Sequence, residues 1–403
     1  MDDCVTAPYD VSFVVVATNG AGTPLVTHAW LFKGLHRANP TLQTYRAGPE
    51  NSANATLTQT GAPNDSTLRF ACSVGTDHGR LARTMTSAGI GYASVPLSNR
   101  TAAQGVAHAL SFFVDSNGLP TSYSAHGTNA VSLSKDTLLT QELDLTPPTS
   151  PLGKGTLSGT VVSAGSGDRL NFAWVQFTDH SLLKLAEYVP NSASFSYTVP
   201  ALDGASITVA ANQGDRDWGP YAVVHQNGLA AGGNATLTMP TPATISAPLA
   251  GAMVNGNTVF QWTGGESVSV VQLQSTGYRW IYIATGEHST TIPSSLFQTL
   301  GIASGSALEF RVEGHGGVAS VDEATGSAGF LDEFAAQETV PDSPTPRSGS
   351  FSFSKVPRGR SRRSRALPPS AAVTNAGDCV SRPSALEMSA IGDIEAACVQ
   401  TVT

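Results

Sequence analysis

Apolar strand-like segments recur along this chain at a fixed distance, and this periodicity limits the possible folds more than any other feature. Three short apolar runs, each ending at an Asn- or Gly-bearing turn, begin at Phe13, Leu110 and Ile207. The spacing is 97 residues in both intervals, from 13 to 110 and from 110 to 207. Equal spacing is typical of tandem copies of one structural unit. The sequence therefore predicts a chain of repeated modules.

The segments around the last two runs also match each other. Four early or closing segments of one copy are followed about 100 residues later by similar segments: 56–58 by 156–158, 68–71 by 170–173, 95–96 by 199–200, and 143–147 by 237–240. The first copy has its late strands only. Its early strands would lie before Met1, so we expect a truncated or misassigned start.

Each copy is predicted to be all-β. In the third copy, short apolar-alternating strands at 155–162, 170–178, 195–199, 205–211, 222–225 and 235–239 are separated by turns, with a helical turn considered at 181–188. Only 13% of the residues are charged, and 40 Gly and 24 Pro interrupt the chain. Few charges and many turn residues favour strands over solvated helices.

After residue 244 the pattern changes to a module of a different kind. We expect strands at 268–274, 280–284, 290–293 and 308–313, with a short helix or turn at 294–300. Beyond residue 333 the chain is polar and rich in Pro, Ser and Arg, a composition that cannot bury enough apolar surface to fold.

The predicted fold class is thus all-β, with tandem antiparallel β-sandwich domains and a disordered C-terminal tail. The expected divisions are a partial β-sandwich (late strands of a truncated repeat) at 1–48, a β-sandwich repeat at 50–148, a carboxypeptidase regulatory-like β-sandwich at 153–242, a fibronectin type III or immunoglobulin-like β-sandwich at 243–333, and the tail at 334–403.

Two resemblances support these divisions. The sequences at 157–161 (Leu-Ser-Gly-Thr-Val), 195–200 and 207–211 resemble the carboxypeptidase regulatory-like, transthyretin-like sandwich of bacterial surface proteins. The usual Asp-Gly-x-Phe turn is replaced by the sequence of residues 191–195, which leaves this assignment open. The sequences at 246–252 and 258–263 resemble a fibronectin type III or immunoglobulin-like domain, with Trp262 as the expected core tryptophan. The resemblances imply spacing, surface display and ligand contact in an extracellular or cell-envelope setting.

No catalytic pattern stands out. HExxH, GxSxG, P-loop and EF-hand signatures are absent from the sequence, so we expect no enzyme, no cofactor and no metal site. The nine histidines show no i, i+2 or i, i+4 pair. His315 lies in a Gly-rich segment, which favours a hairpin turn over a metal or oxyanion site. Trp30, Trp174, Trp262 and Trp280 are expected to be core or half-buried strand residues.

The charge balance and hydropathy exclude two classes of partner. The formal net charge of −8 argues against nucleic-acid binding, although residues 358–365 form an Arg-rich run. No segment of the sequence approaches the ~20 apolar residues of a transmembrane helix. A carbohydrate or another surface protein is the partner class that fits such modules best.

One loop carries the features of a binding site. Asp215, Asp217 and Trp218 place two acids and an aromatic ring directly after a predicted strand. An aromatic face offers contact area to a sugar or protein, and carboxylates offer hydrogen bonds. The alternative, which we favour because no second feature converges on the loop, is a solvated turn whose Trp218 folds back onto the sandwich edge.

Three functions remain open from the sequence. The first is a non-enzymatic surface or secreted protein whose sandwiches act as spacers, adhesion elements or ligand-binding modules. The second is the accessory region of a secreted hydrolase whose catalytic domain lies upstream. The third is a viral coat protein with an Arg-rich arm, and the repeat argues against it because a single jelly roll would not recur at a 97-residue spacing.

Overall fold

The chain folds almost entirely into β-strands. The computed structural model describes residues 7–18, 24–37, 40, 51–76, 83–86, 90–98, 101–162, 169–179, 181–188, 192–214, 220–275, 279–303, 306–325, 349–355 and 397–402. Within these ranges the strands are accompanied by two short helices. The predicted all-β fold class is confirmed.

The repeat at 50–148, called the first repeat from here on, is a sandwich with seven strands among its described residues. Its strands are β3 (Asn51–Thr60), β4 (Leu68–Thr76), β5 (Arg83–Thr86), β6 (Ile90–Ser98), β7 (Ala102–Val114), β8 (Pro120–Ser134) and β9 (Leu138–Asp144). One sheet has the order β6-β3-β9 and the other β5-β4-β7-β8. Strands β3 and β9 run parallel, while the other pairs are antiparallel. Apolar side chains such as Leu57, Val74 and Leu133 fill the space between the sheets.

The module at 153–242, which the sequence analysis treated as the third copy and which is called the second repeat from here on, has the same topology. Its strands are β10 (Lys154–Val162), β11 (Arg169–Phe177), β12 (Leu182–Tyr188), β13 (Ser194–Pro200), β14 (Ala205–Gly214), β15 (Tyr221–Leu229) and β16 (Asn234–Thr238). They form sheets β13-β10-β16 and β12-β11-β14-β15, and β10 again pairs with β16 in parallel. The segments that the sequence matched between these two copies lie on equivalent strands. The common spacing therefore reflects a common strand order.

Alternating side chains explain most of these strands. In β13, Phe195, Tyr197 and Val199 face the core while the residues between them are more exposed. The segment 181–188, considered as a helical turn, is instead edge strand β12, antiparallel to β11. Its leucines alternate between two faces of the sheet. Leu183 and Leu185 join the sandwich core, whereas Leu182 packs with Trp174 in a separate buried cluster on the opposite face.

The C-terminal module is a second kind of sandwich. Strands β17 (Thr244–Ala247), β18 (Val259–Thr263) and β21 (Ser289–Thr291) form one sheet. They pack on β19 (Val268–Ser275), β20 (Arg279–Thr285) and β22 (Leu308–His315), with helix α1 (Ser294–Thr299) at one end. The strands predicted at 268–274, 280–284 and 308–313 and the short helix are all present. Trp262 is 1% exposed and lies in the core, as predicted.

The N-terminal strands extend this C-terminal module. Strands β1 (Tyr9–Thr18) and β2 (Pro24–Leu35) form an antiparallel hairpin. The segment of β2 that begins at His28 then runs parallel to β20 from Trp280 onward. The sequence placed these strands in a truncated copy of the repeat at 1–48. The structure instead joins them to β20, which lies more than 200 residues later in the chain.

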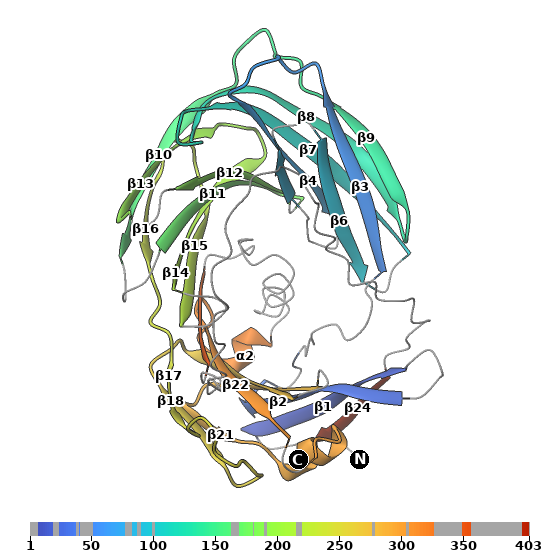
Figure 1. Cartoon of the computed structure of the whole chain (residues 1–403), viewed down its shortest axis with the longest axis vertical. Helices are drawn as coiled ribbons and strands as arrows, with labels where there is room; N and C mark the ends of the chain where they lie inside the picture. Colours follow the sequence, from blue (N-terminus) through green and yellow to red (C-terminus); the bar gives the residue numbers. More distant parts are fainter. Residues whose placement is uncertain are drawn as a thin grey trace, which may run out of the picture.

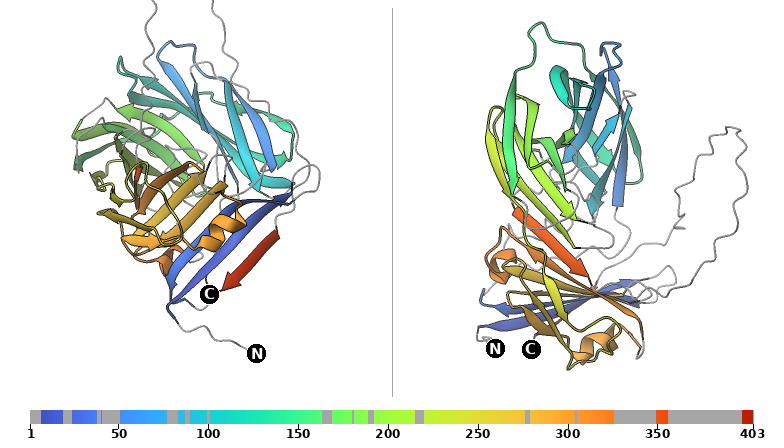
Figure 2. Two further views of the ribbon diagram at one scale, coloured as in Figure 1. Left: turned by 60° about the horizontal axis from the view of Figure 1, so that its bottom comes forward. Right: turned by 60° about the vertical axis from the view of Figure 1, so that its left-hand side comes forward.

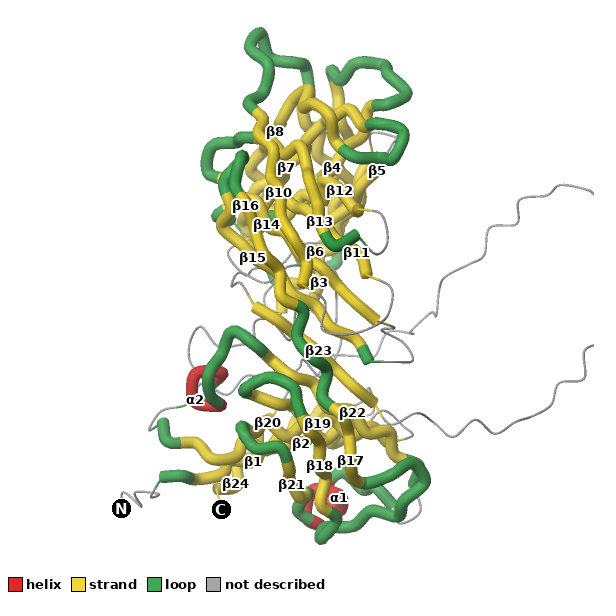
Figure 3. The backbone as a smooth tube through the Cα atoms, turned by 90° about the vertical axis from the view of Figure 1, so that its left-hand side faces the viewer, coloured by secondary structure: helices red, strands yellow, loops and turns green. Residues whose placement is uncertain are grey.

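Two strands of the predicted C-terminal tail complete the large sheet. Strand β23 (Gly349–Lys355) pairs with β15 on one side and β22 on the other, and β24 (Ala397–Val402) pairs with β1. The result is an 11-stranded sheet in the order β12-β11-β14-β15-β23-β22-β19-β20-β2-β1-β24. Figure 1 shows the two repeats at the top and the C-terminal module with the N-terminal hairpin at the bottom. Strand β23 lies between these two lobes (Figures 2 and 3).

Candidate functional site

The loop that the sequence singled out lies outside the described residues. Asp215, Asp217 and Trp218 belong to residues 215–219, which connect β14 to β15. The hairpin closes on the pair Gly214 and Tyr221. Gly214 has φ +96°, and a Cβ there would lie 2.0 Å from the carbonyl oxygen of Pro220, so only glycine fits. The ligand-binding role of this loop stays a prediction.

A group of ionisable side chains lies where the two repeats meet. The outer face of sheet β5-β4-β7-β8 covers the open side of the second sandwich, where β12 contacts β4, β5 and β7 and β13 contacts β8. Five residues of the first repeat thereby belong to the core of the second: Ala71, Leu110, Phe112, Val114 and Tyr123. The Tyr123 hydroxyl donates to the Thr198 carbonyl at 2.7 Å. The outer face of the first repeat thus completes the hydrophobic core of the second repeat, and this is the core that the two repeats share.

A chain of three ionisable side chains crosses this junction. His108 on β7 has its Nε2 2.7 Å from Oδ2 of Asp179, which follows β11 of the other repeat. Its Nδ1 lies 3.3 Å from Nε2 of His126 on β8. Because an ionised carboxylate only accepts, His108 Nε2–H donates to Asp179, whereas the direction of the bond between the two imidazoles follows their tautomers. The ring of Phe177 stacks on both imidazoles, at 4.0 Å from His108 and 5.3 Å from His126.

Burial and these bonds set the protonation states. Burial, and to a lesser extent the nearby His108, lower the pKa of His126 to about 4. Burial raises the pKa of Asp179, but the hydrogen bonds from His108 and from the Ser181 amide outweigh burial and leave the pKa below its ordinary value. At neutral pH the junction therefore holds an ionised Asp179 and a neutral His126.

Close backbone approach brings the two halves of this cluster together. A Cβ on Gly75 of β4 would lie 2.4 Å from both the Asp179 carbonyl oxygen and the Ser181 hydroxyl. Only the missing side chain lets the turn after β11 pack on β4. The amide of Leu182 also donates to the Ser73 hydroxyl at 3.3 Å. The cluster joins the two repeats through polar contacts. His108 at its centre is only 6% exposed and is therefore not accessible to a substrate.

The sequence contained part of the signal for this cluster. His108 and His126 lie at equal distances from Asn117 in the Asn117-Gly118 turn, and Asp115 fixes that turn by accepting from the amides of Asn117 and Leu119 at 2.8 and 2.9 Å. A search for histidines on facing hairpin strands would have paired them. Asp179 belongs to another repeat, and no local pattern pointed to it.

His315 lies in the interior. It is the last residue of β22, is 0% exposed, and has its Nε2 3.9 Å from Oε2 of Glu313. The prediction of a hairpin turn was wrong, because β22 extends through Gly314 and pairs with β19 up to Val268. Burial, and then the Arg311 charge, lower the pKa of His315 to about 3. A neutral His315 thus lies beside the ion pair between the partly exposed Arg311 and the buried Glu313.

Aromatic side chains on the same face of the C-terminal sheet as His315 form a second core, opposite the face that packs on β18. Trp30 stacks on Tyr282 at 4.4 Å and on Phe32 at 5.6 Å, and Trp280 continues the row at 5.8 Å from Tyr282. Trp30 is 0% and Tyr282 1% exposed, so these rings pack against each other and are closed to a ligand. The prediction of core or half-buried positions is confirmed for Trp30, Trp174, Trp262 and Trp280.

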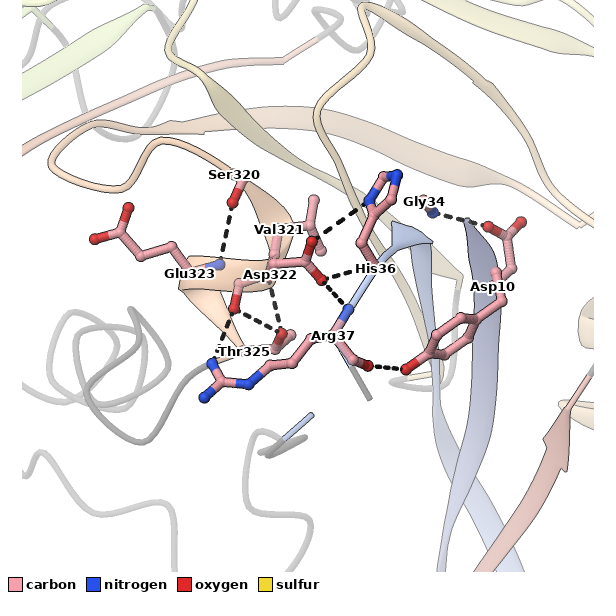
Figure 4. Close-up of polar contacts among 10 residues, drawn as sticks. Asp10, Gly34, His36, Arg37, Ser320, Val321, Asp322, Glu323 and Thr325 are labelled. Atoms are coloured by element: carbon pink, nitrogen blue, oxygen red, sulfur yellow. Dashed lines mark hydrogen bonds and ion pairs between the residues drawn. The ribbon is translucent and has the colours of Figure 1, made fainter. Parts of the chain in front are cut away.

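A carboxylate fastens the N-terminal hairpin to the same module. Asp322, in helix α2 (Val321–Ala324), accepts from the amides of His36 and Arg37 at 2.9 and 3.0 Å (Figure 4). The Arg37 guanidinium donates back to the Asp322 carbonyl at 3.3 Å. At the base of the hairpin, Asp10 accepts from the Gly34 amide at 2.9 Å. These contacts tie the end of β2 to a helix far along the chain.

Two further features are absent from the part of the chain that the structure describes. No group of three or more His, Cys, Asp or Glu lies close enough to hold a metal ion, as far as the described residues extend. Among the same residues, no helix is long and apolar enough to cross a membrane.

Comparison with known proteins gives distant similarities only. No protein-family model matches the sequence, and no curated protein matches it. The shaft pilin SpaA from Lactobacillus rhamnosus GG is 11% identical with a TM-score of 0.15, covering 47% of this chain and 96% of its own. A putative adhesin from Bacteroides ovatus is 10% identical with a TM-score of 0.17, covering 50% and 95%. A streptococcal ancillary pilin is 6% identical with a TM-score of 0.19, covering 65% and 89%. These similarities do not identify what the chain does.

Proposed function

We propose that the chain is a non-enzymatic protein of the cell surface or envelope, in which tandem β-sandwiches act as a stiff spacer that carries binding surfaces. The docking of the two repeats through one shared core is the observation that supports this function. A spacer must hold its ends at a fixed separation. A junction made only of a flexible linker could not do so.

The junction has the physical properties of a fixed joint. The aromatic ring of Phe112 is fully buried at it, although an isolated first repeat would expose that face to water. Polar contacts add direction to the apolar ones, because the bonds from His108 to Asp179 and from Tyr123 to Thr198 cross it at different places. Rotation of one repeat against the other would break both bonds and expose apolar surface.

The location outside the cell rests on the sequence resemblance to bacterial surface modules, and carbohydrate or another surface protein is the partner class that we propose for it. The loop with Asp215, Asp217 and Trp218 is the proposed contact on the second repeat. Its substitution as a unit by Ala should abolish retention on the partner, while thermal unfolding stays unchanged.

A distance measurement between the repeats tests the spacer function. Spin labels on cysteines replacing Leu138 and Val162, which are 65% and 50% exposed on the first and second repeats, report their separation in the full chain with its native cysteines replaced. A stiff spacer gives one narrow distance distribution by pulsed electron resonance. A broad distribution in the folded chain would contradict the proposal. Protease shaving of intact cells tests the location, and protection from protease alongside a cytoplasmic marker would contradict surface display.

A further inference from the structure

The C-terminal module contains a cavity that the spacer function does not use. It has a volume of about 750 Å³ and lies at the end of the sandwich, between the loop of residues 248–256, helix α1 and the start of β22. The side chains of Phe260, Leu273 and Phe310 form its floor. Each is at most 6% exposed, and the Phe260 and Phe310 rings meet edge to face at 4.9 Å. The floor is thus part of the packed core.

The walls are also apolar but remain partly open. Phe297 of α1, Ile302 and Leu308 line the cavity and are only partly buried against the core. At the rim, Leu249 is 74% and Met253 80% exposed. Large side chains of this kind cost free energy in water unless a partner covers them. Cavity and rim together form one continuous apolar surface.

The rim loop is held in place before any ligand arrives. The Ala252 amide donates to the Leu249 carbonyl at 3.0 Å, and Gly251 has φ +83° in that turn. Further along, Asn255 and Thr258 exchange two bonds, from the Asn255 amide to the Thr258 hydroxyl at 2.8 Å and from the Thr258 amide to the Asn255 carbonyl at 3.0 Å. A preformed site loses little entropy on binding.

A glycine fixes the loop against α1. A Cβ on Gly256 would lie 1.9 Å from the Ser294 hydroxyl and 3.1 Å from its amide nitrogen. The loop therefore packs directly on the first residue of the helix. This contact keeps the cavity open between loop and helix.

The polar groups of the described lining limit what the cavity accepts. They are the uncharged side chains of Asn255, Ser294, Gln298 and Ser306, together with Glu309. Glu309 precedes Phe310 of the cavity floor on β22, and neighbouring residues of a strand project to opposite faces of the sheet, so its carboxylate points away from that floor. A charged ligand group would thus lose water without gaining an opposite charge in that lining, whereas an uncharged polar end can hydrogen-bond the amide and hydroxyl groups.

We propose that this cavity binds a small apolar molecule whose polar end is uncharged. Its volume lies within the range of roughly 300–1,000 Å³ that such sites occupy, and its lining combines many apolar side chains with few polar ones, as in known sites. The chain thereby gains a binding site on the C-terminal module, separate from the junction between the repeats and independent of the spacer function.

Nile red, a neutral apolar fluorophore, tests the site in the full chain. We expect saturable binding of one dye per chain, with competition by decanol, an uncharged amphiphile. Decyltrimethylammonium and decyl sulfate, with the same alkyl length and a charge, should each compete roughly tenfold more weakly below their micelle concentrations, equivalent to about 1.4 kcal/mol. Dye binding that does not saturate at one per chain, or equal competition by decanol and the charged amphiphiles, would overturn the proposal.

Two variants locate the binding. Ala307→Trp fills the cavity from its exposed wall without removing core atoms, and Phe297→Gln makes a wall polar; each should weaken dye binding at least tenfold. Leu138→Gln, on the first repeat, is the matched control for an exposed apolar residue and should leave binding unchanged. Unchanged binding in Ala307→Trp with an unaltered melting temperature would refute the location.

Discussion

The shared core predicts an unusually large cost for Phe112→Ala. In an isolated first repeat this ring would lie on an outer sheet face, and truncating an exposed side chain changes the free energy of unfolding by about 0.5 kcal/mol or less. In the observed fold the ring is 0% exposed and lies 6.0 Å from Tyr123, within the core of the second repeat. Truncating a fully buried phenylalanine costs about 3–5 kcal/mol. The two arrangements therefore differ several-fold in the expected cost.

Hydrogen exchange measured by mass spectrometry on the full chain reads this cost locally. Phe112→Ala should speed exchange in its own strand β7 and also in β12 and β13 of the other repeat, because those strands lose the surface that covers them. Leu138→Ala serves as the control, since Leu138 is 65% exposed on the same repeat. A loss below about 1 kcal/mol, with β12 exchanging at its original rate, would refute the idea that the repeats share a core.

The remaining predictions concern the same fold at other points. Gly75→Ala should loosen the junction and lower the melting temperature, whereas Gly286→Ala, where a Cβ meets only the Ser267 carbonyl at 3.8 Å, should be tolerated; equal melting temperatures would contradict the close approach. The pKa of His126 is about 4 in the folded chain and about 6.5 in the unfolded chain, so the folded chain binds fewer protons between these values. The contribution of His126 to the free energy of unfolding is therefore complete above pH 6.5 and falls by about 3 kcal/mol toward pH 4. In His126→Gln the midpoint of urea unfolding should depend less on pH in that window, and an unchanged pH dependence would contradict this assignment. Trp262→Ala should cost about 3–5 kcal/mol in urea unfolding of the C-terminal module, and a melt unchanged by it would remove the indole from the core. Deleting residues 1–48 should leave β20 without β2 and lower the melting temperature of that module; an unchanged melt would show that the hairpin contributes nothing.

Several features of the fold followed from local sequence patterns. A side chain on a strand points to alternate faces, so the alternation at Phe195, Tyr197 and Val199 predicted a strand with one buried face without knowledge of its neighbours. Turn residues marked where strands end, and the aromatic strand around Trp262 marked the core of the last module. The 97-residue spacing of two runs placed β7 and β14 at equivalent positions.

Runs with no alternation held information that the sequence alone left incomplete. Residues 107–112 of β7 are all buried, which indicates a strand covered on both faces. With His108 and Ser111 between apolar residues, the segment did not indicate a second covered face before the structure was known. Only the tertiary structure identified the covering surface as the open side of the next repeat, and only there did Asp179 come within 2.7 Å of His108.

The sequence by itself determined many of the strands in the two repeats and in the C-terminal module, the repeat and the all-β class, because these depend on side-chain period and backbone preference over a few residues. The tertiary structure decided which edges pair: β2 beside β20, β23 between β15 and β22, and one repeat against the other. A strand edge offers the same row of amides and carbonyls whatever its side chains are, so its partner is selected by shape and burial across the whole molecule.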